Sequence, residues 1–170
     1  GSCYIDKDLK NQDIAIKDGK IDKIGKIEEE AKESFDAKGL TVLPGCIDTQ
    51  THFREPGSTD TEDLHSGSRA AIVGGITSVF EMPNTNPPTS NKEEFQKKLD
   101  LAKNRMYCNY AFYFGATADN AIELADLKNL EGCCGIKLFA GSSTGNLLVA
   151  EEEDIEKVFK SCSKVVAVHS

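Results

Sequence analysis

The sequence has fewer positive than negative side chains, with 20 lysines and arginines against 28 aspartates and glutamates. The net charge of -8 disfavours a nucleic acid or an anionic membrane as a partner. Long hydrophobic runs are also missing: no apolar stretch approaches the roughly 18 residues of a membrane span, and the polar start has no signal-peptide core. We therefore expect a cytoplasmic protein in which local cations hold any anionic substrate.

Cysteine pairs of the zinc-binding CxxC type are absent, although the chain contains six cysteines. Several of these cysteines lie in apolar runs, namely Cys46, Cys108, Cys133 and Cys134. A scattered set without paired spacing is typical of neither a disulfide framework nor a structural zinc site. We expect reduced and buried thiols.

The first part of the chain, residues 1–40, is strongly polar. Alternation in "DIAIKDGKIDKIG" predicts two short strands, one with Ile14 and Ile16 and one with Ile21 and Ile24, around a turn at Asp18-Gly19. The charge-rich "KIEEEAKESFDAKG" that follows is typical of solvated surface. We therefore predict a small β-sandwich-like segment over residues 1–40.

The second part, residues 41–170, alternates apolar runs with amphipathic helices, which is typical of a parallel sheet with crossover helices. The runs are "TVLPGCID", "ITSVFEMP", "YCNYAFYFG", "CCGIKLFAG" and "VVAVHS". Five strands and four helices make about half of an eight-stranded α/β barrel, which needs roughly 250 residues. An open doubly wound sheet gives the same pattern, so the count leaves both architectures open.

Helix boundaries are marked by local signals. Capping-box pairs at Thr59/Glu62 and Ser90/Glu93 predict the starts of the first two helices, and Gly74-Gly75 predicts the end of the first. His65 falls within that first helix, and we expect a surface or capping histidine there.

Polar residues recur at every second position in "IDTQTHFREPG", at Asp48, Gln50, His52 and Arg54. Strand alternation places such residues on one face. Polar side chains are costly on a buried parallel strand unless they serve a site. A single histidine there is most often structural, but these neighbours favour a functional site.

Lys137 lies in the apolar "GIKLFAG", where burial would lower the pKa of its ammonium and leave a nucleophilic amine. Such an amine can take up carbon dioxide, and the resulting carbamate can bridge two metals. The alternative is a lysine whose stem follows the strand and whose head lies in water. His169 ends the last run, where barrels and open sheets alike place functional groups.

Two loops complete the expected rim. The prolines of "MPNTNPP", residues 82–88, predict a rigid loop in which Asn84 serves either as a turn residue or to orient an amide or carboxylate. "GSSTG", residues 141–145, lacks the Lys-Ser/Thr ending of a Walker sequence, and we interpret it as a flexible rim loop.

Together, "LPGCIDTQTHFREPG", "GGITSVFEMPNTNPP", "GIKLFAGSSTG" and "VVAVHS" resemble the dihydroorotases of the amidohydrolase superfamily over nearly the whole chain. The resemblance implies that residues 41–170 form about the first half of a TIM (β/α)8 barrel. It also implies the reversible hydrolysis of dihydroorotate to N-carbamoyl-aspartate in pyrimidine synthesis.

By position, the resemblance implies that His52 is a metal ligand, Lys137 a carbamylated bridging ligand and His169 a ligand of a second metal. The full-length protein would bind one or two zinc ions. Gln50 stands where the family usually has the first histidine of an HxH pattern. An amide oxygen binds zinc less well than imidazole, so we expect a weak or lost ligand position there.

The resemblance also implies that Arg54 and Asn84 hold the substrate carboxylate, because the guanidinium fork suits that group. The family's catalytic aspartate would lie beyond residue 170. We therefore expect no catalytic acid or base in this chain, which would be an inactive amino-terminal fragment. Its exposed barrel edges would favour a homo-oligomer or another association.

Two alternatives stay open. One is a noncatalytic dihydroorotase-like subunit that scaffolds aspartate transcarbamoylase, with Gln50 marking the decay of a metal site. The other is a different cyclic amidase, such as a hydantoinase or an allantoinase. "HFREPG" favours a dihydroorotase, because those relatives usually differ after the histidine.

Overall fold

The computed structural model describes residues 1–143 and 146–170, so Thr144 and Gly145 of the expected rim loop lie outside the described residues. The chain divides into two compact units, Gly1–Gly45 and Cys46–Ser170. The boundary therefore falls after Gly45 rather than after residue 40. The run "TVLPGCID" is split, because Thr41–Val42 forms strand β5 and pairs in parallel with a strand of the first unit.

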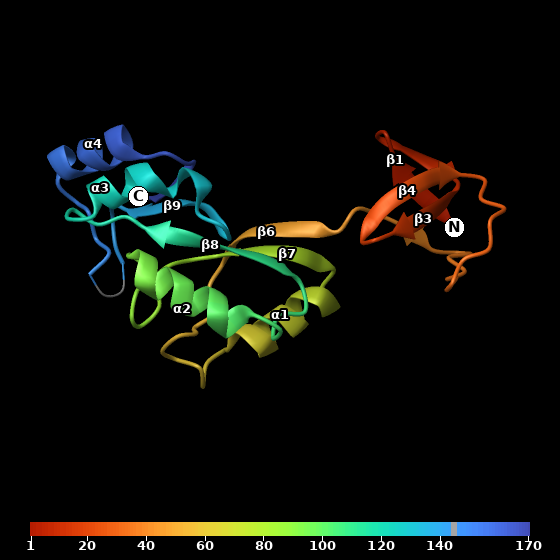
Figure 1. Cartoon of the computed structure of the whole chain (residues 1–170), viewed down its shortest axis with the longest axis horizontal. Coiled ribbons are helices and arrows are strands. Elements are labelled where there is room, and N and C mark those ends of the chain that lie inside the picture. The colour runs from red at the N-terminus through yellow and green to blue at the C-terminus, as the bar shows by residue number, and fades with distance from the viewer. Residues whose placement is uncertain (144–145) are drawn as a thin grey trace. The chain divides into compact units, whose positions relative to one another are not determined.

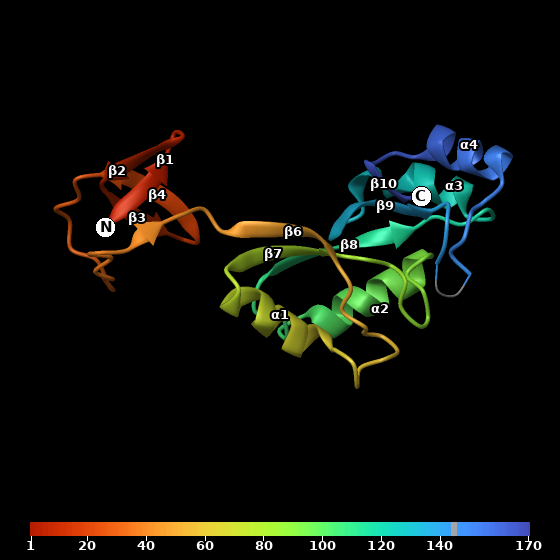
Figure 2. The ribbon, with the colours of Figure 1, turned by 180° about the vertical axis from the view of Figure 1, so that it is seen from behind.

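The first unit contains two small sheets (Figures 1 and 2). One has the order β2-β1-β5, with β1 at Ser2–Ile5 and β2 at Asp8–Asn11. The other is the antiparallel pair of β3 (Asp13–Lys17) and β4 (Lys20–Gly25). Asp18 and Gly19 join this pair with φ of 51° and 72°, the left-handed backbone that tight hairpin turns favour. The predicted hairpin is therefore confirmed.

The second unit holds one five-stranded sheet in which all neighbouring strands are parallel. Its strands are β6 (Cys46–Thr51), β7 (Ile76–Glu81), β8 (Asn109–Gly115), β9 (Cys133–Phe139) and β10 (Val166–His169). The spatial order β10-β9-β8-β7-β6 follows the sequence without a reversal. A doubly wound sheet reverses its order at a switch point, so this arrangement is that of a partial α/β barrel.

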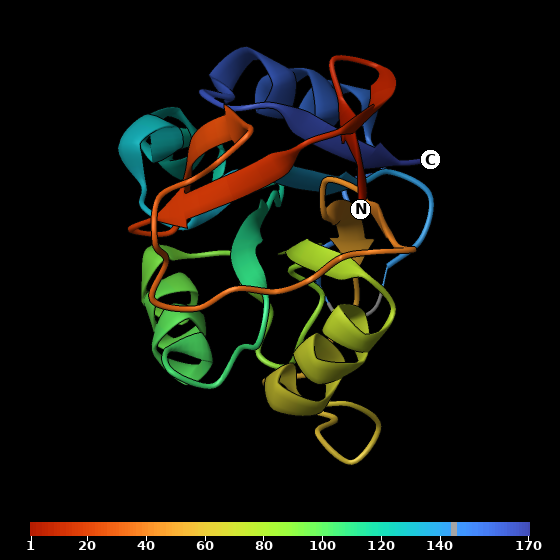
Figure 3. The same ribbon diagram turned by 90° about the vertical axis from the view of Figure 1, so that its right-hand side faces the viewer.

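Helices cover the outer side of this curved sheet. They are α1 (Leu64–Val73), α2 (Lys92–Ala102), the short α3 (Ala121–Ala125) with the 3₁₀ helix η1 (Asp126–Asn129), and α4 (Glu152–Ser161). Figure 3 shows them following one another in an arc, from yellow α1 through green α2 to blue α4. Among the described residues, no helix is long and apolar enough to cross a membrane.

The core lies between the sheet and these helices. Phe95 of α2 is completely buried against β8, with ring centroids 6.4 Å from Phe112 and 6.0 Å from Phe114. Other buried members include Leu64, Val79, Leu124, Leu127, Ile136, Leu138 and Val158. Burial of this apolar surface fixes the helices on one side of the sheet. The other side carries Lys137 of β9 together with aromatic rings, among them Phe80 and Tyr113, whose centroids are 6.5 Å apart.

The edge position of β6 corrects the expectation that this strand is buried. β6 pairs only with β7 among the named strands, and Ile47 is 58% exposed, so this strand is not buried as expected. Cys46 is also exposed, whereas Cys108 and Cys133 are buried. None of the six cysteines is paired in a disulfide, and the expected burial holds for Cys3, Cys108 and Cys133 but not for Cys134 and Cys162, which are partly buried.

The predicted start of α1 at Thr59/Glu62 is wrong, because the chain still turns through those residues. The N-cap is Asp63, whose carboxylate accepts a hydrogen bond from the Ser66 amide at 2.6 Å, while Ser66 Oγ accepts from the Asp63 amide. The predicted end is confirmed, since Gly74 is the C-cap.

The Ser90/Glu93 pair is displaced by one residue. Asn91 is the N-cap of α2, and its Oδ1 accepts from the Glu94 amide at 2.9 Å. Asparagine is among the strongest N-cap residues and supplies the acceptor at the position where the backbone turns.

The two N-cap assignments for α2 predict different effects of substitution on the free energy of unfolding. We expect Asn91→Ala to lower the free energy of unfolding by about 1 kcal/mol, because one amide of the first helical turn loses its acceptor. Ser90→Ala is the control and should change it by less than about 0.5 kcal/mol. Urea unfolding of the chain measures both, and a larger loss for Ser90→Ala would restore the original assignment.

Candidate active site

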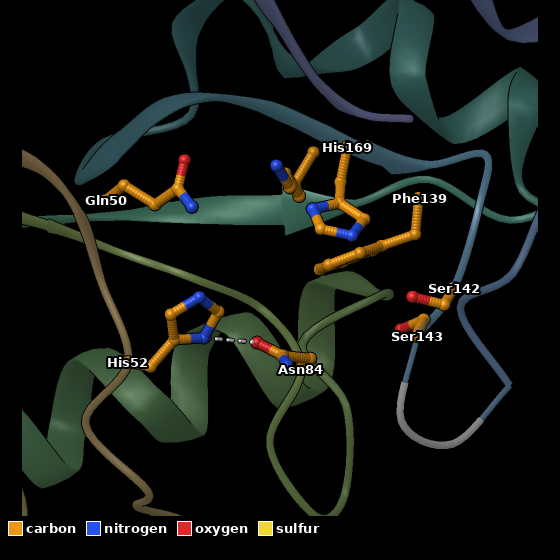
Figure 4. A pocket seen from close by; sticks show the side chains of 8 residues that line it. Gln50, His52, Asn84, Phe139, Ser142, Ser143 and His169 are labelled. Carbon is orange, nitrogen blue, oxygen red and sulfur yellow. Dashed lines mark hydrogen bonds between the residues drawn. The ribbon is translucent and has the colours of Figure 1, made fainter.

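A cavity of about 340 Å³ lies at the carboxyl ends of the parallel strands (Figure 4). Its lining comes from β6, β9, β10 and the segments that follow the strands. The lining residues are Gln50, His52, Asn84, Lys137, Phe139, Ser142, Ser143 and His169. The structure thus brings His52, Lys137 and His169, which are far apart in the sequence, together around one cavity with Gln50.

The Asp48-to-Arg54 series does not stay on one face. β6 ends at Thr51, so strand alternation does not extend to His52 and Arg54. Gln50 and His52 line the cavity, whereas Asp48 accepts a hydrogen bond from the Gln50 amide at 3.0 Å and lines no described cavity.

Arg54 lines an adjoining cavity of about 410 Å³. The other residues around it are Pro56, Ser58, Asn84, Thr85, Asn86 and Pro88. Asn84 is therefore common to both cavities and connects the predicted substrate residues. Within the described residues, the side chain of Arg54 forms no ion pair.

His52 is held by the amide of Asn84, whose Oδ1 lies 2.9 Å from His52 Nδ1. A carboxamide oxygen only accepts hydrogen bonds, so Nδ1 carries the proton and donates it. The other ring nitrogen, Nε2, then keeps its lone pair. In Figure 4 this nitrogen points away from Asn84, on the side of Gln50.

The surroundings of His52 keep it neutral. Burial lowers the pKa of the imidazole, while the hydrogen bond with Asn84 acts in the opposite direction. The positive charges of Arg54, Lys137 and Lys98 lower the pKa further. A neutral imidazole with a free Nε2 is the form that binds a metal ion.

Lys137 is only 2% exposed, so the alternative in which its head lies in water is wrong. Its ammonium lies 5.1 Å from the centroid of the Phe139 ring, and burial lowers the pKa of the amine. Within the described residues, Lys137 forms no hydrogen bond or ion pair through its side chain. A desolvated amine of this kind is more nucleophilic than a surface lysine.

His169 and Gln50 come from β10 and β6, the two edge strands of the sheet. Both side chains are exposed, and the His169 ring lies 6.0 Å from that of Phe139. His65 lies apart from the cavity, as expected for a surface histidine. It is exposed on α1, with Nε2 3.2 Å from the hydroxyl of Tyr107.

The donor set decides whether a metal ion fits. Among the described residues, no group of three or more His, Cys, Asp or Glu side chains gathers to hold one. The cavity instead offers two imidazoles, two amides, two hydroxyls and the Lys137 amine. A protonated lysine repels a dication, whereas a carbamate on the same nitrogen supplies two anionic oxygens. The residues therefore fit a divalent cation when Lys137 carries that modification.

Sequence reasoning missed a buried ion pair beside the site, between Glu81 at the end of β7 and Lys98 on α2. The two side chains are 1% and 0% exposed. Burial raises the pKa of Glu81 to about 8, and burial lowers that of Lys98. The signal was present in "ITSVFEMP", where a carboxylate interrupts an apolar strand as Lys137 does.

A second missed pair fixes the loop after His52. Glu55 accepts two hydrogen bonds from the Arg105 guanidinium, at 2.7 and 3.0 Å, and one from the Leu64 amide at 2.9 Å. The carboxylate thus ties this loop to the start of α1 and to the residues that follow α2. Nothing local in "HFREPG" indicates Arg105 as the partner.

Comparison with known proteins identifies relatives of this chain. Residues 41–165 match the sequence profile of the Amidohydrolase family. A dihydroorotase from Methanosarcina mazei is 37% identical over 167 residues, which are 97% of this chain and 36% of that protein. An allantoinase from Escherichia coli O1:K1 is 34% identical over 97% of this chain and 37% of its own length.

A solved structure agrees with these relatives. The L-hydantoinase (dihydropyrimidinase) from Arthrobacter aurescens superposes with a TM-score of 0.85 and 29% identity, over 95% of this chain and 37% of that one. The chain thus spans little more than a third of the relatives that it matches. The profile match includes His52, Asn84 and Lys137 and stops just before β10. This chain belongs to the amidohydrolase family.

Proposed function

We propose that this chain is the amino-terminal part of a metal-dependent dihydroorotase, which hydrolyses dihydroorotate reversibly to N-carbamoyl-aspartate. The observation that carries the proposal is the gathering of His52, Lys137 and His169 around one cavity, next to a second cavity lined by Arg54. The similarity to a dihydroorotase over 97% of the chain supports it.

The residues that would hold zinc are His52 through Nε2, His169, and Lys137 as a carbamate. When bound, zinc would polarise the amide carbonyl and lower the pKa of a water molecule. The hydrogen bond of Asn84 to Nδ1 keeps the Nε2 lone pair of His52 free for this role. Gln50 offers an amide oxygen, which makes its side of the site the weaker one.

Substrate selection would depend on Arg54. Dihydroorotate carries a carboxylate, whereas hydantoin and allantoin have no carboxylate. The half-buried guanidinium of Arg54 offers a planar fork for that group, and the shared Asn84 offers an amide. In a chain with a net charge of -8, this cation supplies the local attraction that an anionic substrate needs.

Proton transfer requires residues from elsewhere in the whole protein. The described residues that line the two cavities include no aspartate or glutamate. The leaving amide nitrogen therefore has no carboxylic acid from this chain as its proton donor. We accordingly propose that the chain alone is inactive and that the family's catalytic aspartate lies in the remaining part of the protein.

A noncatalytic subunit that scaffolds aspartate transcarbamoylase is the second candidate. It is favoured by Gln50, which places a poor zinc ligand in the cavity. The edge strands β6 and β10 each have one named partner strand, so each offers an edge for a homo-oligomer or another chain. The allantoinase and hydantoinase similarities support a third candidate, a different cyclic amidase.

Turnover by the full-length protein tests the substrate. Supplied with zinc and bicarbonate, it should hydrolyse dihydroorotate, and Arg54→Ala should lower kcat/KM by about 10- to 100-fold through the loss of charged hydrogen bonds. The matched substrate control is hydantoin, which has no carboxylate. The kcat/KM of any hydantoin hydrolysis should change little with Arg54→Ala. Turnover of hydantoin without turnover of dihydroorotate would contradict the assignment.

Metal affinity tests the role of Gln50. Gln50→His should tighten zinc binding by about tenfold, equivalent to about 1.4 kcal/mol, because imidazole replaces an amide oxygen. Titration calorimetry with bicarbonate present measures the affinity, and His65→Gln is the control that should leave it unchanged. Absence of zinc binding in both the chain and Gln50→His would favour the scaffold.

A further inference from the structure

A buried polar network lies behind the cavity, on the helix side of the sheet. Lys98 of α2 pairs with the Glu81 carboxylate, and its Nζ also donates a hydrogen bond to the carbonyl oxygen of Met82 at 3.0 Å. The same ammonium lies 5.1 Å from the centroid of the Phe112 ring. Lys98 therefore links α2 to the first peptide beyond β7.

The backbone of Met82, here called the Met82 peptide, is held through both its amide and its carbonyl group. Its amide donates to the carbonyl oxygen of Thr51 at 2.9 Å, and Thr51 is the residue directly before His52. Its carbonyl accepts from Lys98. Two residues further on, Asn84 Oδ1 accepts a hydrogen bond from His52 Nδ1. The Met82 peptide thus fixes the relative position of the segments that carry His52 and Asn84.

The remainder of the loop is anchored independently. The Asn86 amide donates to the Pro56 carbonyl at 3.0 Å, and the Thr89 carbonyl accepts from the Gly115 amide at 2.8 Å. These contacts lie beyond Asn84 in the sequence. On the β7 side of Asn84, the Pro83 carbonyl accepts from the Thr85 and Thr89 amides, both at 2.9 Å, and Lys98 adds the restraint on Met82 from the helix side of the sheet.

Stability alone is a weak reason for this ion pair. Desolvation of two charges offsets most of their attraction, and apolar pairs of similar size are often equally stable or more stable. A methionine at position 98 would fill similar space without a donor for the Met82 carbonyl. What the ammonium adds is direction, because its hydrogen bond fixes one peptide in one orientation.

We propose that Lys98 is a positioning residue that, together with Glu81, fixes the Met82 peptide and thereby holds Asn84 where it keeps His52 in the Nδ1–H tautomer. The inference rests on the proposed function only where it makes His52 Nε2 a metal ligand. The orientation and tautomer of the ring belong to the chain itself and are measurable without metal.

Two variants separate positioning from packing. Glu81→Gln keeps the Lys98 nitrogen and its N–H donor for the Met82 carbonyl, whereas Glu81→Gln/Lys98→Met removes the donor. Long-range proton–nitrogen correlation NMR on the ¹⁵N-labelled chain at about pH 8, where imidazoles are neutral, reports each tautomer. The chain has three histidines, and His65→Gln and His169→Gln leave His52 assigned.

We expect the Nδ1–H form of His52 to predominate in the unmodified chain and in Glu81→Gln, and to lose that predominance in the double variant. The urea midpoint of the double variant should equal or exceed that of Glu81→Gln. Persistence of the Nδ1–H form in a folded double variant would overturn the proposal. If the double variant does not fold, Asn84→Ala is measured instead. Retention of the Nδ1–H form of His52 in that variant would also overturn the proposal.

Zinc titration of the same variants separates this inference from the proposed function. With bicarbonate present, the double variant should bind zinc about tenfold more weakly than Glu81→Gln, as expected when a partner that orients a ligand is lost. A tautomer change without zinc binding in any variant supports the positioning role and contradicts the metal role of His52.

Discussion

The common direction of the five strands from β6 to β10 is the constraint on which the site depends. Parallel strands joined by crossover helices all end at one edge of the sheet. That edge receives side chains from several strands and the segments that follow them, among them His52, Lys137 and His169. The apolar core between the sheet and the helices enforces the direction, because each helix must return across the sheet to bury its apolar face. The chemistry of the cavity is therefore a consequence of the packing on its opposite side.

Within that cavity, the balance of charge differs from that of the chain. The chain is acidic, yet the lining contains imidazoles, amides, hydroxyls and a buried lysine, with no carboxylate among its described residues. Burial lowers the pKa of His52, and the positive charges of Arg54, Lys137 and Lys98 lower it further. The same burial lowers the pKa of Lys137. Neutral nitrogen donors beside a modifiable amine suit a cation, and the adjoining Arg54 suits an anion.

Much of the fold was predictable, because periodicity and turn residues are local properties. The strands of the parallel sheet, the Asp18-Gly19 hairpin and the end of α1 at Gly74 follow from such patterns. The order of those strands did not, because the pattern also fits a doubly wound sheet, and the barrel was implied only by the family resemblance. The predicted N-caps were wrong because several side chains that can accept the capping hydrogen bond, such as Ser90 and Asn91, lie within one or two residues of each other. The backbone geometry that selects among them is not visible in the sequence. The exposure of β6 was missed because alternation does not show which strand forms an edge.

The site residues were found through their types and their places at strand ends, but their partners were not. The hydrogen bond between His52 and Asn84 and the link from Lys98 to Met82 join segments that only the folded sheet brings together. Arg54 lies in the adjoining cavity because β6 ends at Thr51 and the chain turns away. Contacts of this kind depend on tertiary geometry, which local patterns do not contain.

The central claim is that the desolvated amine of Lys137 becomes an anionic ligand in a cavity shared with His52 and His169. Carbon-13 NMR of the chain with ¹⁵N-lysine, ¹³C-bicarbonate and zinc tests it directly. The account predicts one ¹³C carbamate signal coupled to a lysine nitrogen, strengthened by zinc and lost in Lys137→Arg. No such signal in the chain, or one that persists unchanged in Lys137→Arg, would contradict the account.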